Sequence, residues 1–175
     1  MAIIEAIATQ YLEADVASVT FSSIPATYEH LQVHGSDRAA GATTGQAYYI
    51  EFNNTAGSPG NKYASHVIRA SSSTVGANAL NFQPYVKIYD GIHGSSTEAS
   101  EYATIFIDVL DYANTNKNTT VQLVGGQSIS NSNSRLFVGS GLWDNTAAIT
   151  QIKFTPSNGN MVRCSEFTLY GIKSS

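Results

Sequence analysis

Apolar residues recur at every second position in several short stretches of the chain, which is the pattern of half-buried β-strands. The pattern predicts strands over residues 18–22, 28–38 and 46–53. In the second of these, Leu31 and Val33 share one face while polar side chains occupy the other, because successive side chains of a strand point to opposite sides. These stretches therefore predict strands with one face in a core.

Further strands are expected where apolar runs lie between turn-rich segments, at residues 63–70, 82–89, 102–112, 121–124 and 136–138. The run 102–112 is apolar on both faces, which favours a central position in a sheet. Pro84 favours an edge position for its strand, because proline cannot donate to a ladder. Segments rich in Gly, Ser and Asn predict loops at residues 39–45, 54–61, 71–78 and 90–100.

The last part of the chain, residues 149–173, has the pattern of two strands joined by a turn. Phe154 lies on the apolar face of the first strand, and Phe167 and Leu169 share a face of the second. Residues 155–160 (TPSNGN) contain a proline and an Asn-Gly pair, which suit a tight reversal of the chain. We predict a β-hairpin whose apolar faces join the core.

Tyr170 and Ile172 give this last strand a second apolar face, which predicts a cover from the domain itself or from a neighbouring subunit. The N-terminal stretch is also apolar at Ile3, Ile4 and Ile7. We interpret residues 1–15 as an arm that packs on a neighbouring surface, with a simple first strand as the alternative. We predict that these five residues form an interface.

These segments amount to nine or ten strands at regular spacing, without a convincing long helix or an internal repeat. The fold class they predict is all-β, a two-sheet antiparallel β-sandwich of the jelly-roll kind. At 175 residues, the chain suits one domain that buries most of its apolar surface, and we assign it to residues 16–175.

Composition and charge limit the classes of partner that the chain is expected to bind. Charged residues make up 13% of the chain, well below the usual quarter, which fits a surface partly hidden in an assembly. The net charge is −4, and the nine basic residues are scattered, so we expect no binding to nucleic acid. The apolar start is too short to span a bilayer and does not resemble a secretory signal, so we expect no membrane partner.

No arrangement of reactive residues points to catalysis, a metal or a cofactor. Residues 126–130 (GQSIS) come close to the G-x-S-x-G pattern of hydrolases but end in serine within a polar loop. His30 and His34 share a strand face but lie roughly 13 Å apart, too far for one zinc ion. Asp108 and Asp111 point to opposite faces and cannot act together on one bond. We therefore expect a non-enzymatic protein without cofactors.

Aromatic residues are the remaining candidates for a binding site. They form a sugar-stacking platform if several of them reach the surface together, whereas their alternation with apolar residues favours a place in the core or in an interface. The residues concerned are Tyr48, Tyr49, Tyr63, Tyr85, Tyr89 and Trp143.

The order of several segments resembles small structural proteins encoded by tailed phages, in particular those of marine and freshwater bacteria (cyanophage-like). The resemblance runs from about Val16 to Lys173, and its motifs contain no reactive residues. The segments are 19–25 (VTFSSIP), 28–38 (YEHLQVHGSDR), 49–53 (YIEFN), 107–112 (IDVLDY), 141–143 (GLW) before 149–152 (ITQI), and 167–172 (FTLYGI).

The resemblance implies a virion protein, and the function it favours is a capsid decoration (cement) protein. We expect such a protein to form a homotrimer on the outer capsid surface and to bind the major capsid protein, where many weak contacts add up. In that case Ile3, Ile4 and Ile7 dock on the shell or on a sister subunit. The alternative is a tail-fibre or tail-associated module that binds a receptor or a glycan, through loops such as 54–61 and 90–100.

Overall fold

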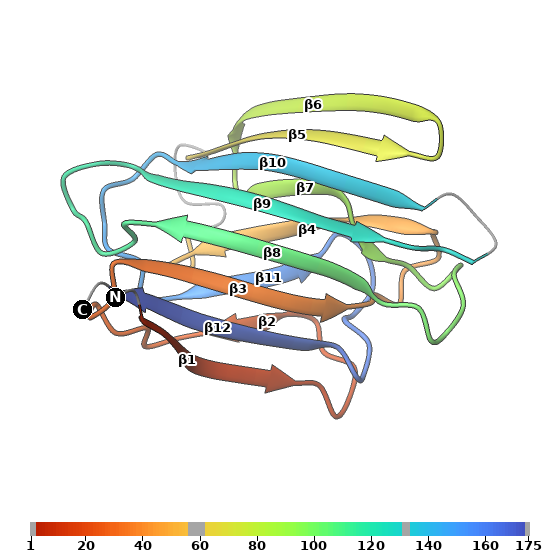
Figure 1. Cartoon of the computed structure of the whole chain (residues 1–175), viewed down its shortest axis with the longest axis horizontal. Coiled ribbons are helices and arrows are strands. Elements are labelled where there is room, and N and C mark those ends of the chain that lie inside the picture. Colours follow the sequence, from red (N-terminus) through yellow and green to blue (C-terminus); the bar gives the residue numbers. More distant parts are fainter. Residues whose placement is uncertain (1–2, 56–61, 131–133, 174–175) are drawn as a thin grey trace.

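The computed structural model describes residues 3–55, 62–130 and 134–173, which form two antiparallel β-sheets packed face to face (Figure 1). The large sheet has the strand order β1 (Ile3–Tyr11), β12 (Glu166–Lys173), β3 (His30–Asp37), β8 (Ala103–Leu110), β9 (Thr119–Gln127), β10 (Arg135–Trp143), β5 (Tyr63–Ser71) and β6 (Thr74–Gln83). The small sheet has the order β2 (Val19–Phe21), β11 (Ile152–Pro156), β4 (Gly45–Phe52) and β7 (Val86–His93). The prediction of an all-β, two-sheet antiparallel sandwich is confirmed.

The core lies between the sheets and is built from the inward positions of each strand. Leu31 and Val33 on β3 and Ile50 and Phe52 on β4 belong to this core, and all four side chains are fully buried. Burying one such side chain contributes about 1.5–3 kcal/mol. The period-2 pattern of these two strands therefore identified their core faces correctly.

Aromatic rings fill the centre of this core. The rings of Phe154 and Phe167 stack with centroids 5.5 Å apart, and those of Tyr63 and Trp143 stack at 6.2 Å. The Tyr63 hydroxyl accepts a hydrogen bond of 2.9 Å from the backbone N–H of Phe52, which satisfies a polar group that would otherwise be costly to bury.

The predicted C-terminal hairpin is wrong in its pairing. Phe154 and Phe167 are both core residues, but β11 pairs with β2 and β4 in the small sheet, whereas β12 pairs with β1 and β3 in the large sheet. The segment between them crosses the end of the sandwich, where Met161 forms isolated bridges with Val16 and Ala39. Turn residues permit the chain to reverse, but they do not determine which sheet receives the next strand.

Residues 3–11, for which an arm and a first strand were the alternatives, form the edge strand β1 of the chain's own large sheet. β1 pairs with β12 along its whole length, with an irregularity between Ala6 and Ala8. The preferred interpretation, an arm packed on a neighbouring surface, is therefore replaced by the strand. Ile7 packs against the core of its own chain.

Two predicted loops are partly strands. The second edge strand, β6, covers residues 74–83. Of these, 74–78 belong to the predicted loop 71–78, and 82–83 begin the predicted strand 82–89. Strand β7 continues to His93 into the predicted loop 90–100, and the rest of that loop is tied down by Arg38. The Arg38 guanidinium donates to the backbone oxygens of Thr97, Glu98 and Glu101 over 2.6–3.1 Å. The parts of the predicted arm and loops at residues 1–2, 56–61 and 131–133 lie outside the described residues.

Candidate interaction surface

The outer face of the large sheet carries side chains that align across all eight strands. Figure 1 looks at this face, with β6 at one edge and β1 at the other. One row of directly opposed residues runs from edge to edge in the order Thr9, Thr168, His34, Phe106, Val124, Val138, Ile68, Ala77. Directly opposed side chains in antiparallel strands lie close enough to touch. The row thus forms one continuous strip on the surface, which we call the central row.

The middle of the central row is apolar and open to solvent. Phe106, Val124, Val138 and Ile68 keep 44–49% of their surface exposed, and the neighbouring Leu136 keeps 61%. Along the outward positions of β8, β9, β10 and β5, the one charged side chain is Asp108. Exposed apolar patches with few charges are typical of surfaces that bind another macromolecule. Strand β8 is central, as predicted, but its second apolar face is uncovered in this chain.

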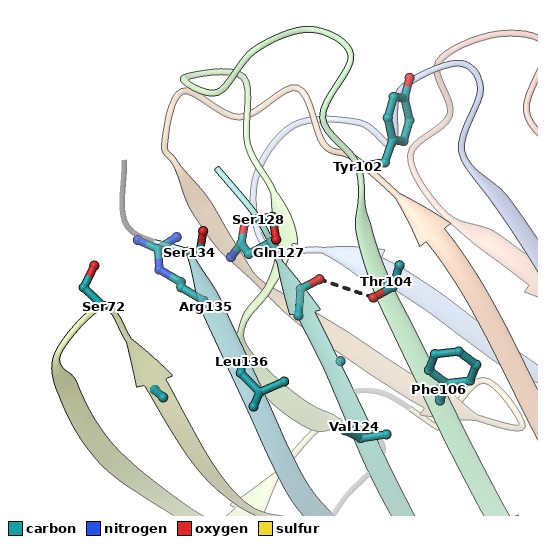
Figure 2. A pocket seen from close by; sticks show the side chains of 13 residues that line it. Ser72, Tyr102, Thr104, Phe106, Val124, Gln127, Ser128, Ser134, Arg135 and Leu136 are labelled. Carbon is teal, nitrogen blue, oxygen red and sulfur yellow. Dashed lines mark hydrogen bonds between the residues drawn. The ribbon is translucent and has the colours of Figure 1, made fainter. Parts of the chain in front are cut away.

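A hollow of about 730 Å³ interrupts this face at Gly126, whose missing side chain leaves a gap between Thr104 and Leu136 (Figure 2). Phe106, Val124 and Leu136 lie at one end of the hollow, and polar side chains lie at the other. An added Cβ at Gly126 would lie 2.9 Å from the backbone oxygen of Arg135, so a larger residue would disturb the neighbouring strand. This hollow gives the apolar surface a concave part.

Hydrogen bonds and ring contacts connect the central row with strand β12. The Gln32 side chain donates to the Asp108 carboxylate over 2.7 Å, and its oxygen lies 2.8 Å from Nε2 of His34. The His34 ring lies between the rings of Phe106 (4.6 Å) and Tyr170 (4.8 Å). The Asp108 carboxylate is thereby held by a hydrogen bond from β3, and Tyr170 becomes part of the same aromatic surface as Phe106.

The structure separates the five residues predicted as an interface. Ile4, Tyr170 and Ile172 lie on the outer face of the large sheet, where Ile4 is opposed to Ile172 and is 60% exposed. Ile3 lies opposite Lys173 on the other side of β1, and Ile7 packs against the core. Three of the five are therefore continuous with the outer face of the sheet, and whether they form an interface stays a prediction.

The candidate reactive groups have structural partners. His30 accepts a hydrogen bond of 3.0 Å from the backbone N–H of Asp111, and the ion pair with Lys117 lowers the pKa of the Asp111 carboxyl. Ser130, in the GQSIS segment, donates both its backbone N–H and its hydroxyl to Glu101. These bonds lower the pKa of the Glu101 carboxyl and make it a weaker base. Within the described ranges, no group of three or more His, Cys, Asp or Glu residues is arranged to hold a metal ion.

The aromatic candidates divide between core and surface. Tyr48, Tyr63 and Trp143 are buried. Tyr49 and Tyr85 stack at 3.8 Å on the outside of the small sheet, next to the half-exposed Tyr89. Burial, together with the hydrogen bond between the hydroxyls of Tyr49 and Tyr85, raises the pKa of Tyr49 to about 12. We call these last three residues the tyrosine cluster.

Sequence reasoning missed the apolar middle of the central row. Phe106 and Val124 lie in predicted strands, but the apolar residues on both faces of 102–112 predicted only a central position in a sheet. The signal was present, because Phe106, Val124 and Val138 break the alternation that a solvated face would show. What the sequence lacked was the register that places these residues side by side.

No family model and no curated protein matches this chain. Among solved structures, the crystal structure of scytalido-glutamic peptidase with a transition state analog inhibitor is similar at 9% sequence identity. The alignment covers 91% of this chain and 66% of that chain, so this chain spans just under two thirds of its length, with a TM-score of 0.26. A likeness at that score supports no statement about activity. In the described part of the chain, no helix is long and apolar enough to cross a membrane.

Proposed function

We propose that this protein is a non-enzymatic structural component of a virion, a decoration (cement) protein that binds the major capsid protein on the outer surface of the shell. The observation that supports this proposal is the charge-poor apolar middle of the central row, on a face that the chain itself leaves open. The resemblance of the ordered sequence segments to structural proteins of tailed phages is the reason for choosing a virion as the assembly.

A shell lattice suits this face for an energetic reason. The central row runs across eight paired strands, so its side chains are held on a rigid support and lose little freedom when they are covered. A protein that binds many equivalent sites on one lattice needs only modest affinity at each. The few charges on this face also lower the cost of removing it from water.

The test is binding of the purified chain to capsid shells of its virion that lack it, measured by co-sedimentation. We expect Phe106→Lys and Val138→Lys to weaken binding at least tenfold, because each places a charge in the buried contact. Thr155→Lys, on the outside of the small sheet, is the matched control and should bind as the wild type does. Equal binding of all three variants would contradict the proposed face, and a wild-type chain that leaves shells undecorated would contradict the function.

The second candidate is a tail-associated module that binds a glycan, and the tyrosine cluster is the observation that favours it. Surface aromatic rings provide flat apolar faces beside polar hydroxyls, which suit the two sides of a sugar ring. Retention of the purified chain on host polysaccharide, together with failure to bind shells, would favour this candidate over the first.

A further inference from the structure

A second hollow, of about 510 Å³, lies beside the turn between β5 and β6 and differs in chemistry from the one on the apolar face. Its lining contains two arginines and four side-chain hydroxyls but no apolar side chain. The lining residues are Arg69, Ser71, Ser72, Ser73, Thr74, Gly76, Asp90 and Arg135. Cavities of about 300–1,000 Å³ are the size that holds small ligands.

Positive charge exceeds negative charge in this hollow. Arg69 forms an ion pair with Asp90, and Nε of Arg135 lies 4.0 Å from the same carboxylate oxygen. One carboxylate therefore faces two guanidinium groups. Next to the hollow, Nζ of Lys87 lies 4.5 Å from the centre of the Tyr89 ring, and Cζ of Arg69, which lines the hollow, lies 5.8 Å from the same centre. In a chain of net charge −4, this is a local excess of cations that favours an anionic ligand.

The Arg135 guanidinium is held in place but is not fully paired. Its side chain is 16% exposed, and Nη2 donates to the Thr44 hydroxyl over 3.1 Å. Its Nη1 is buried beside Gly45 and has no hydrogen-bond partner among the described residues, so a ligand in the hollow would contact the other atoms of the guanidinium. A mostly buried, positioned guanidinium binds a carboxylate more strongly than a freely mobile surface arginine does, because less side-chain entropy is lost. Figure 2 shows Arg135 between Ser72 and Ser134, and both Arg135 and Ser72 line the two hollows.

The rest of the lining suits a ligand with hydroxyl groups. Ser71, Ser73 and Thr74 offer hydroxyls that both donate and accept hydrogen bonds. Gly76 keeps the floor open, because a Cβ there would have its nearest neighbour, Nε of Arg69, 4.0 Å away. An inorganic anion needs neither this volume nor this number of hydroxyls.

We propose that this hollow binds an acidic sugar, with the ligand carboxylate on Arg69 and Arg135 and the sugar hydroxyls on the β5–β6 turn. The tyrosine cluster lies next to it through Tyr89 and provides apolar ring faces on which a longer saccharide can continue. This inference does not depend on the virion role, and it would give the glycan-binding alternative a specific ligand class.

The experiment is calorimetric and NMR titration of the full chain with a hexuronate trisaccharide, a neutral glucose trisaccharide and acetate. We expect the uronate to bind at least tenfold more tightly than either of the others, and to bind more weakly as NaCl is raised from about 0.05 to 0.5 M. Arg135→Gln should weaken uronate binding about tenfold or more, since it removes a charge-assisted contact. Arg163→Gln, which removes an exposed arginine elsewhere, is the matched control.

Gly76→Val tests the site without disrupting the fold, because its side chain extends into the hollow without removing a charge or crowding the backbone. We expect it to abolish uronate binding and to leave the thermal unfolding midpoint unchanged or raised. Absence of uronate binding would overturn the proposed site, as would binding that survives both Arg135→Gln and Gly76→Val. Equal affinity for acetate and uronate would overturn the assignment to a sugar. Binding of the neutral trisaccharide alone would overturn the proposed acidic-sugar site, but it would agree with the alternative function of a glycan-binding module.

Discussion

At the scale of single residues, the most unusual group is the Asp37 carboxyl. It points into the core from the end of β3, is fully buried, and has no hydrogen-bond partner for either oxygen among the described residues. Burial raises the pKa of this carboxyl well above its ordinary value, because the charged form is poorly solvated in the core. Tyr48 lies near enough for its own pKa to rise, through burial first and the Asp37 charge second.

This burial predicts a pH-dependent loss of stability. In the window above the ordinary Asp value and below the raised one, the unfolded chain releases the proton that the folded chain retains. The free energy of unfolding therefore falls as pH rises through this window, by up to about 1.4 kcal/mol per pH unit from this one group. We expect Asp37→Asn to remove that contribution, measured as the difference between the urea unfolding curves of the two proteins from pH 4.5 to 8.

Other titrating groups affect both proteins alike, so the difference between them isolates Asp37. His93, whose pKa is lowered mainly by burial, contributes the opposite trend to both. Asp144→Asn changes an exposed carboxylate and should retain the wild-type pH dependence. Parallel curves for wild type and Asp37→Asn would show that the buried carboxyl does not titrate in this way.

At the scale of strands, period-2 alternation predicts a strand only where one face is buried and the other is polar. It located β3 and β4 correctly, because their inward residues are large and apolar. It failed for β6, whose sequence TVGANALNFQ consists mostly of small and polar residues, because an edge strand with Gly76 over a hollow has little to bury. Asp90 and Gly91 begin the predicted loop 90–100, yet they lie within β7, where Asp90 adopts a positive φ of 53°.

Strand pairing was less predictable than strand position. Residues 155–160 contain turn-forming residues, and these are compatible both with a hairpin and with a crossing from one sheet to the other. The crossing is favoured by the whole core, because it places Phe154 and Phe167 on opposite sheets with their rings stacked at an interplanar angle of 14°. A local sequence pattern does not determine which sheet a strand joins, because that choice depends on the side chains that both sheets bury between them.

The stacked rings make a testable prediction about contact across the sandwich. Phe154→Leu and Phe167→Leu should each lower the free energy of unfolding by about 1–2 kcal/mol through loss of buried volume. Because the rings touch, the double variant should depart from additivity by about 0.5–1.5 kcal/mol in urea unfolding. Phe154→Leu combined with Phe106→Leu is the control pair, since Phe106 lies on the outer face, and it should be additive within about 0.5 kcal/mol.

At the scale of the whole molecule, the two outer faces have different properties. The large sheet offers an apolar surface that ends at Ile4 and Ile172, whereas the small sheet carries the tyrosine cluster and the ion pair of Lys153 with Glu51. The sequence predicted an interface near Ile4 and Ile172 because both are apolar beside other apolar residues. It could not predict the middle of the central row or the hollow with Arg69, because their residues come from strands distant in the sequence.

The two edges of the large sheet also differ, and this difference bears on the predicted homotrimer. β1 contains Glu5 and an irregular pairing between Ala6 and Ala8, both of which hinder strand addition at that edge. A contact there is therefore expected to use side chains, chiefly Ile4 with Ile172, rather than backbone pairing. β6 contains no charged residue over its ten positions, and it exposes 73% of Val75, so it is the edge at which backbone pairing with another copy would be easiest.

These differences make the trimer prediction specific enough to test. Light scattering of the purified chain should give three times the 18.7 kDa mass of one chain. Ile4→Glu should shift that mass to a monomer, because the charge is placed in an apolar contact, while the protein stays folded since Ile4 is 60% exposed. Val75→Glu is the matched control at the opposite edge and should leave the trimer intact. If Val75→Glu dissociates the assembly and Ile4→Glu does not, subunits pair through β6, and the interface assigned to β1 and β12 is wrong.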